Sequence, residues 1–194
     1  QELAQRFLNA LIAGDMPALL DCYDDDIVFE APGLPMILGK AGVEKHYRES
    51  VHGEFFAQGN TDVPVCTDCH QSHVIRPKWD PESASYATNV PEMCLKCHSD
   101  QAMIGRNGGL TEMRAETYNK SYHGAASRLG DKTVANCASC HEAHDIRRST
   151  DPKSATHPSN LHQTCGKCHL GPDHPQMEVY KESKHGILYE AFRD

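Results

Sequence analysis

Four cysteine motifs in this sequence have the spacing of a covalent haem-attachment site. Each has two cysteines three positions apart and a histidine directly after the second: Cys66, Cys69 and His70; Cys94, Cys97 and His98; Cys137, Cys140 and His141; Cys165, Cys168 and His169. In this pattern the thiols add to the two vinyl groups of a haem, and the histidine becomes an axial ligand of its iron. The sequence therefore predicts four haem c groups, numbered haem 1 to haem 4 in chain order.

Three other uses of paired cysteines explain less of the pattern. Two zinc sites would give no reason for a histidine after every pair, and the inner cysteines of each half are slightly too far apart for the usual zinc spacing. A thioredoxin-like redox motif would occur once, and a disulfide framework does not need the histidines.

The ninth cysteine, Cys22, stands outside the motifs. We interpret it as a small buried apolar residue, with a reactive thiol as the alternative.

Five further histidines recur at equivalent positions and are candidate second ligands. A low-spin haem needs a strong ligand on each face of its iron. Two of the five follow a motif histidine by three residues, and three stand in a Ser-x-His-Gly sequence: His73 and His144, then His52, His123 and His185. We predict that all five bind iron, the alternative being a solvated or hydrogen-bonding imidazole.

The spacing limits which haem each candidate can serve. His73 lies one helical turn from His70, so it cannot reach the opposite face of the same iron. We therefore expect His73 to serve haem 2 and, by the repeat, His144 to serve haem 4. His52 and His123 would then complete haems 1 and 3. His185 would remain for a neighbouring subunit or a longer parent chain, unless the register slides and His52 is the spare ligand.

Several other residues have simpler interpretations. His46, His157 and His162 do not recur and are interpreted as ordinary polar residues, and the methionines show no repeat that would favour ligation. Arg76 and Arg147 are equivalent in the repeat. Each is expected either to pair with a haem propionate or to be exposed.

The motifs lie in a repeat with a period of 71 residues. Tyr47–Gly53 aligns with Tyr118–Gly124, and the aligned stretches need no gap as far as the last haem motif. A third copy begins at Tyr180. The units 47–117 and 118–188 each hold two haem motifs, so residues 46–194 are predicted to form two tandem di-haem modules.

The elements expected to position these motifs are short helices joined by long loops. Helix signals cover 43–52, 112–123 and 176–185, and each ends at a glycine that suits the position after a helix C-terminus. The linkers 77–91 and 149–160 are rich in Pro, Ser and Asn, and strand signals are nearly absent. The predicted fold class is mainly α, with short helices wrapped around four haems.

Residues 1–45 have a different pattern. Five apolar side chains from Leu3 to Ile12 fall on one helical face, Asp15 and Pro17 can open a second helix, and 24–30 is typical of a strand. This stretch resembles the start of the cone-shaped domains of the nuclear-transport-factor-2 and polyketide-cyclase superfamily, without the long sheet that forms their pocket. We interpret it as a cap or docking segment.

The composition agrees with a chain that recruits a prosthetic core. Only 39% of its 194 residues are hydrophobic, whereas it has nine Cys and 13 His. Such a chain usually depends on disulfides or a bound group. The net charge of −8 argues against nucleic-acid binding, and no apolar run is long enough to span a membrane.

Residues 46–194 resemble the multihaem cytochromes c of the hydroxylamine oxidoreductase and octahaem reductase group. The shared motifs are Tyr-x-x-Ser-x-His-Gly and Cys-x-x-Cys-His-x-x-His, and the closest stretch is Cys165–Tyr189. The resemblance implies haem pairs stacked in parallel and an Asp-His pair at a catalytic haem, here Asp173 and His174. This sequence departs from the group in having four motifs rather than eight, and it stops at Asp194, before the region where the group has the tyrosine that cross-links its catalytic haem.

These observations predict a tetrahaem cytochrome c that carries electrons through bis-histidine haems. Because haem c is attached outside the cytoplasm, we expect a removed secretion signal and a periplasmic or extracellular location. The expected partners are redox proteins or an extracellular electron acceptor. One alternative is an enzyme, similar to hydroxylamine oxidoreductase, that acts on a small nitrogen or sulfur species at one open haem. Another is a homo-oligomer or conducting filament with a histidine lent between subunits.

Overall fold

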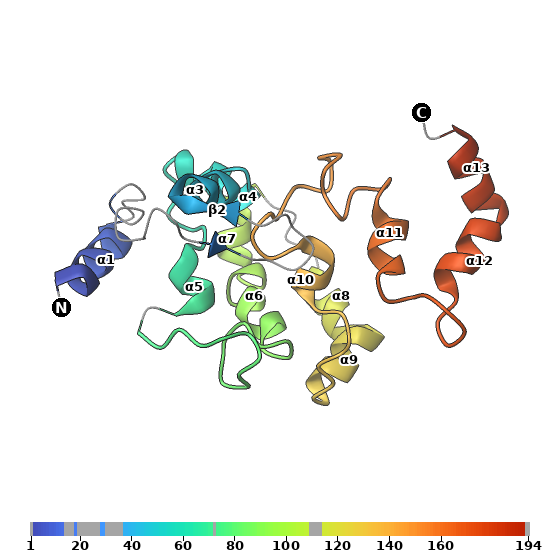
Figure 1. Ribbon diagram of the computed structural model, residues 1–194, viewed down its shortest axis with the longest axis horizontal. Helices are drawn as coiled ribbons and strands as arrows, with labels where there is room; N and C mark the ends of the chain where they lie inside the picture. The colour runs from blue at the N-terminus through green and yellow to red at the C-terminus, as the bar shows by residue number, and fades with distance from the viewer. Residues whose placement is uncertain are drawn as a thin grey trace.

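The computed structural model is mainly helical, as predicted, and describes residues 2–13, 18, 28–29, 37–71, 73–108 and 114–192. Short helices alternate with long loops, and the two termini lie at opposite ends of the molecule (Figure 1). The elements in chain order are α1 (Glu2–Ala13), β1 (Val28–Phe29), β2 (Ile37–Leu38), α3 (Gly39–Arg48), α4 (Val51–Ala57), α5 (Cys66–His70), α6 (Val90–His98), α7 (Gln101–Arg106), α8 (Arg114–Lys120), α9 (Tyr122–Arg128), α10 (Cys137–His141), α11 (Leu161–Gly166), α12 (Gln176–Glu182) and α13 (Lys184–Phe192).

The N-terminal elements follow the sequence prediction in part. The first helix forms as α1, and the strand expected within 24–30 is present as β1, which pairs antiparallel with β2. The expected apolar face of α1 is not buried at Ile12, which is 80% exposed, whereas Ala10 is buried. The second helix expected at Asp15 and the lone Cys22 lie outside the described residues.

Three bent helix pairs recur along the chain: α3–α4, α8–α9 and α12–α13. At the first bend, the Ser50 hydroxyl donates to the Tyr47 carbonyl (2.7 Å) and accepts from the Gly53 backbone N–H (3.1 Å). Ser50 therefore caps the new helix by satisfying an otherwise free N–H group. The same two bonds recur at Ser121 and Ser183.

The glycine of each helix pair has a different role from the predicted one. We expected Gly53 to follow a helix C-terminus, but it lies buried in the first turn of α4. A Cβ atom at this position would lie 1.9 Å from the Tyr47 carbonyl oxygen. Gly124 and Gly186 make the same close approach to Tyr118 and Tyr180. The glycine is therefore needed because two helices meet there with backbone nearly touching backbone.

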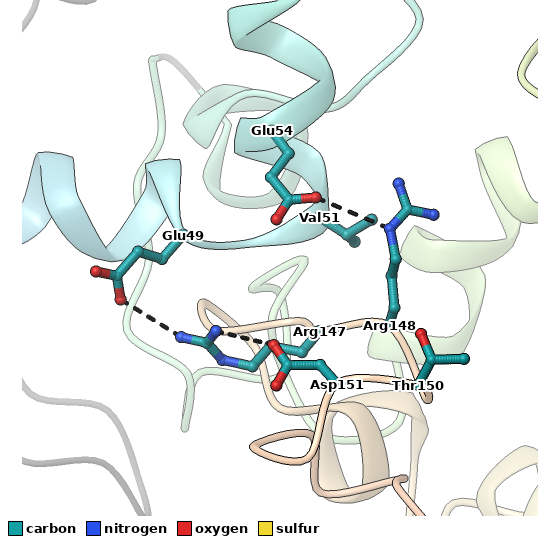
Figure 2. Close-up of a pocket in the computed structure, with 7 residues that line it drawn as sticks. All are labelled: Glu49, Val51, Glu54, Arg147, Arg148, Thr150 and Asp151. Atoms are coloured by element: carbon teal, nitrogen blue, oxygen red, sulfur yellow. Dashed lines mark hydrogen bonds and ion pairs between the residues drawn. The ribbon is translucent and has the colours of Figure 1, made fainter.

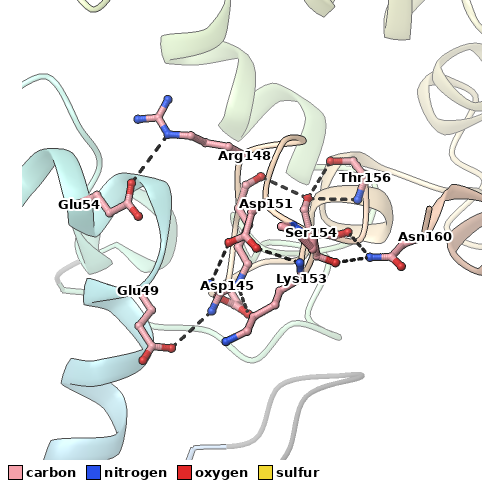
Figure 3. Close-up of polar contacts among 11 residues, drawn as sticks. Glu49, Glu54, Asp145, Arg148, Asp151, Lys153, Ser154, Thr156 and Asn160 are labelled. Carbon is pink, nitrogen blue, oxygen red and sulfur yellow. Dashed lines mark hydrogen bonds and ion pairs between the residues drawn. The ribbon is translucent and has the colours of Figure 1, made fainter. Parts of the chain in front are cut away.

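The linkers between haem motifs repeat the same hydrogen bonds at positions 71 residues apart. The Asn89 side-chain amide donates to the Ser83 carbonyl, and that of Asn160 donates to the Ser154 carbonyl, each at 2.8 Å. Figure 3 shows the second of these linkers, with Asn160 directed back to Ser154. Side-chain amides thus take the place of a regular backbone ladder in holding these loops.

The polypeptide by itself buries little apolar surface. Among the described residues, the buried hydrophobic side chains are Ala10 and Val90, which are 5% and 6% exposed. The accessible surface is 13047 Å², whereas a folded monomer of this mass is expected to expose about 9,200 Å². None of the described helices has the length and apolar character needed to cross a membrane.

Replacing the glycine at the first bend is expected to destabilise the fold. Gly53→Ala would force the Tyr47 carbonyl away, which we expect to lower the free energy of unfolding by about 1–3 kcal/mol. Gly105→Ala is the matched control, because a Cβ on this glycine of α7 meets nothing within 4 Å. The control is expected to raise stability by about 0.4–1 kcal/mol. Chemical unfolding followed by circular dichroism tests both, and equal effects would contradict the packing role.

Candidate haem-binding site

The structure brings motif histidines together with candidate second ligands in three pairs. The ring centres are 5.8 to 6.3 Å apart in the pairs His70–His144, His52–His98 and His123–His169. A metal–imidazole bond is roughly 2 Å long, so two imidazoles on opposite sides of one metal have ring centres about 6 Å apart once the ring widths are added. The three separations therefore fit an iron held between each pair of rings.

These pairs differ from the register expected from the sequence. His52 lies beside the motif histidine of haem 2, not haem 1, and His123 lies beside that of haem 4, not haem 3. His144 lies beside His70 of haem 1, in the preceding module, and not beside His169 of haem 4. The spacing showed which iron a histidine cannot reach but not which it does reach, because the long loops decide that.

The remaining two candidates lie on the surface. His73 and His185 are both exposed, and within the described ranges neither is in ring contact with a motif histidine. The sequence predicted that His73 serves haem 2, but the structure does not bring His73 to the histidine of that motif. Their ligation of iron stays a prediction.

Burial keeps two of the paired histidines in the form that binds a metal. The pKa of His52 is lowered to about 4, first by burial and then by the nearby His98. The pKa of His144 is also lowered to about 4, by burial and then by His70 and His46. Since a neutral imidazole has the lone pair that a metal needs, these rings are ready to act as ligands at neutral pH.

The cysteines of successive motifs are close neighbours. Burial raises the pKa of Cys69, and the negative charge of a Cys97 thiolate raises it further. Cys94 and Cys137 are hydrogen-bonded to each other, which raises the pKa of Cys94 and lowers that of Cys137 to about 7. Burial and then Cys165 raise the pKa of Cys140. Each motif thus has a cysteine near a cysteine of the next motif in the chain.

A cross-module contact holds His144 beside His70. The Val51 backbone N–H at the start of α4 donates to the Ile146 carbonyl at 2.8 Å. Figure 2 shows the side chains around this bond, with Arg147 directed to Glu49 and Arg148 directed to Glu54. Two modules that are separate in sequence are therefore joined through the segment that carries His144.

Arg147 is the most buried cation of this contact. Its side chain is 13% exposed and makes ion pairs with Asp145 (2.8 Å), Asp151 (3.2 Å) and Glu49 (3.4 Å). Its repeat equivalent Arg76 is 35% exposed and pairs with acidic residues of its own loop. The prediction that these arginines are simply exposed is wrong for Arg147, whose charge is satisfied by carboxylates of this chain.

The histidines interpreted as ordinary polar residues have distinct surroundings. The His46 ring lies 6.2 Å from His144, so it adjoins the candidate ligand of haem 1. No repeat marks His46, and sequence reasoning therefore missed this position. His162 contacts Tyr180 and Tyr189, and His157 is hydrogen-bonded to Ser159, which agrees with their polar interpretation.

The catalytic candidates implied by the family resemblance lie close to the histidine of the haem 4 motif. The His174 ring is 5.8 Å from His169, which also faces His123. Asp173 and His174 are both exposed. The structure thus places His174 beside the proximal histidine of haem 4, and the catalytic role of this pair stays a prediction.

Two backbone positions directly after motif histidines are strained. Gln71 has φ 63° and Glu142 has φ 65°, and their extended ψ values put both in a region that is almost restricted to glycine. Such strain costs about 1–3 kcal/mol and concentrates at functional sites. Both positions lie between a motif histidine and a candidate second ligand, which is His73 in one case and His144 in the other.

Comparisons with known proteins agree with this reading of the motifs. Residues 123–194 match a family model described as seven times multi-haem cytochrome CxxCH, and residues 4–73 match the SnoaL-like domain model. The second match agrees with the pocket-domain resemblance of the N-terminal segment and extends past residue 45 into the first haem motif.

A curated relative also matches. The chain is 30% identical over 150 residues to a probable nitrite reductase-hydroxylamine oxidoreductase fusion protein from Kuenenia stuttgartiensis. The match covers 70% of this chain and 16% of that protein, so the chain spans only a small part of the relative's length. No solved structure matches. The motifs and these matches support a multihaem cytochrome that binds haem c.

Removing the Arg147 charge is expected to loosen the cross-module contact. Arg147→Ala would break three ion pairs and leave the half-buried Asp145 without its strongest partner, which we expect to cost about 1–3 kcal/mol of unfolding free energy. Arg76→Ala is the matched control, and its more exposed pairs are expected to contribute about 1 kcal/mol or less. Equal losses in thermal unfolding of the haem-loaded proteins would contradict the special role of Arg147.

Proposed function

We propose that this chain is an extracytoplasmic electron-transfer domain that holds four haem c groups in a line. The observation that carries the proposal is that a cysteine of each motif lies near enough to one of the next motif to perturb its pKa, in the pairs Cys69–Cys97, Cys94–Cys137 and Cys140–Cys165. Cys94 and Cys137 are also hydrogen-bonded to each other. The haems supply one-electron redox chemistry, and the polypeptide sets their order, ligands and exposure.

Three of the four haems take two histidine ligands under this proposal. His144 completes haem 1, His52 completes haem 2 and His123 completes haem 4. Their ring separations support this register, and the two Ser-x-His-Gly pairs are equivalent under the 71-residue shift. Two imidazole ligands, one on each face of an iron, favour a low-spin haem, which changes charge with little rearrangement.

Haem 4 is the proposed exchange point with a redox partner. Cys165 and Cys168 are exposed, whereas the cysteines of the other three motifs are half-buried. A redox partner could therefore approach haem 4 more closely than the other three haems. The chain carries a net charge of −8, and haem propionates add to it, so a partner with a basic surface fits best.

The proposed register is tested by removing two histidines that are equivalent in the repeat. His144→Ala is expected to convert one haem of the four from low spin to high spin, because haem 1 loses its second ligand. His73→Ala is expected to leave the spin state of all four unchanged. Ferric absorption and electron paramagnetic resonance spectra give the spin states, and a low-spin haem 1 in the His144 variant would overturn the register.

A small-molecule redox enzyme is the second candidate, favoured by the position of His174 beside His169 and by the hydroxylamine oxidoreductase named in the curated relative. Such an enzyme needs a haem with an open coordination site. We expect the electron-transfer function instead. Because the proposed register gives haem 3 a single histidine ligand, hydroxylamine or cyanide added to the oxidised protein should change the spectrum of that haem alone, and to the same extent in the wild type and in His174→Ala. A shift that is lost in His174→Ala but kept in the control His162→Ala would favour the enzyme.

A further inference from the structure

The two loops that follow haems 1 and 3 are equivalent in sequence but differ in what covers them. The His144 loop (residues 144–150) packs on α3–α4 of the preceding module, where the Ile146 carbonyl accepts from Val51. The His73 loop (residues 73–79) is its repeat equivalent and lies open. Its apolar side chains are among the most exposed in the described chain: Val74 at 51%, Ile75 at 65% and Trp79 at 74%.

The covered loop shows what kind of surface the open loop fits. The His144 loop docks on a bent helix pair built from Tyr-x-x-Ser-x-His-Gly, and α12–α13 is a third such pair. Its residues Ile187 and Leu188 are 58% and 44% exposed. An open copy of the docking loop and an open copy of its receptor therefore exist in the same chain.

The charged contact of the covered loop has a counterpart in these two open surfaces. Glu49 of α3–α4 pairs with Arg147 at 3.4 Å. In the repeat, Glu182 of α12–α13 stands at the position of Glu49, and Arg76 of the His73 loop stands at the position of Arg147. Glu182 is exposed. The opposite charges needed for docking are thus present on both sides.

The second charged contact of the covered loop is replaced by an apolar one in the two open surfaces. Arg148 of the covered loop pairs with Glu54 at 3.8 Å. The equivalent residues are Pro77 in the His73 loop and Ile187 in α13. An exposed ion pair is therefore replaced by two apolar side chains, which bury favourably against each other. A change on one side alone would have left a charge facing an apolar residue.

The helix pair α8–α9 fits the His73 loop less well. Lys120 stands at the position of Glu49 and would face Arg76, so two like charges would be opposed.

The backbone N–H group that Val51 donates in the covered contact also has an equivalent in α13. The N–H of Lys184 lies at the start of that helix, as the N–H of Val51 lies at the start of α4. Among the repeat-equivalent helix pairs, α12–α13 is thus the better receptor.

We propose that the His73 loop docks on α12–α13 of a second copy of this chain. The loop between α5 and α6 and the pair α12–α13 lie far apart in Figure 1, so one copy cannot satisfy both of its own surfaces. The two surfaces are different, so the contact is head to tail and each added copy leaves one of each surface open. This inference goes beyond the proposed electron-transfer function and does not depend on the haem ligands.

Sedimentation velocity of the haem-loaded protein tests the contact. The wild-type protein is expected to sediment faster as its concentration rises, since a small docking surface gives weak, concentration-dependent association. Ile75→Glu destroys the loop surface, and Ile187→Glu destroys the receptor surface. Each variant alone is expected to remain a monomer, with unchanged haem absorbance as the control for folding. Both side chains are exposed, so neither change disturbs the interior.

Mixing the two variants is the decisive measurement. The Ile75→Glu chain keeps an intact receptor and the Ile187→Glu chain keeps an intact loop, so the mixture is expected to form a dimer and nothing larger. Tyr122→Glu on α9 is the matched control and should associate like the wild type. A wild-type protein that stays monomeric, a mixture that stays monomeric, or a loss of association in Tyr122→Glu with none in Ile187→Glu would each overturn the proposal.

Discussion

Two imidazoles on one iron must approach from opposite sides, and the remaining organisation of this chain depends on that constraint. A motif histidine is fixed close to its own cysteines, so the second ligand has to come from a different segment. In the proposed register, the segment for haem 1 belongs to the next module, because His144 lies beside His70. The chain must then fold one module against the other, and the contacts of Val51, Arg147 and Arg148 are the consequence.

This dependence explains how a chain with so little buried apolar surface adopts a defined structure. Interior packing does not hold the modules together, since the described residues offer almost no hydrophobic core. Backbone hydrogen bonds, side-chain amides and ion pairs position the helices instead. Each of these contacts contributes little in water, because solvent competes for the same groups. Haems inserted between the paired histidines would add the apolar contact area that the polypeptide lacks.

The sequence predicted the parts of this structure that are local and failed where long loops decide. The motifs, the mainly helical fold and the 71-residue equivalence of hydrogen bonds follow from short-range patterns. The register of second ligands did not follow, because spacing restricts only neighbours within a helical turn. Gly53 was misassigned for a related reason. A glycine after a helical stretch fits both a helix end and a close helix crossing, and only the position of Tyr47 separates them.

The contact of the His144 loop with the preceding module also makes the arrangement of the modules directional. Repeated along the chain, this relation would have each module supply a loop to the module before it and offer a bent helix pair to the loop of the module after it. The contact between α3–α4 and the His144 loop is the one place where the described chain shows this relation satisfied. A repeat with such a rule resembles a one-dimensional stack, in which every internal surface is covered by a neighbour and the terminal surfaces are exposed. The exposed apolar residues Ile75 and Ile187 lie on a loop and a helix pair that no other module covers within the described residues, which is why they are the features least suited to an isolated molecule in water.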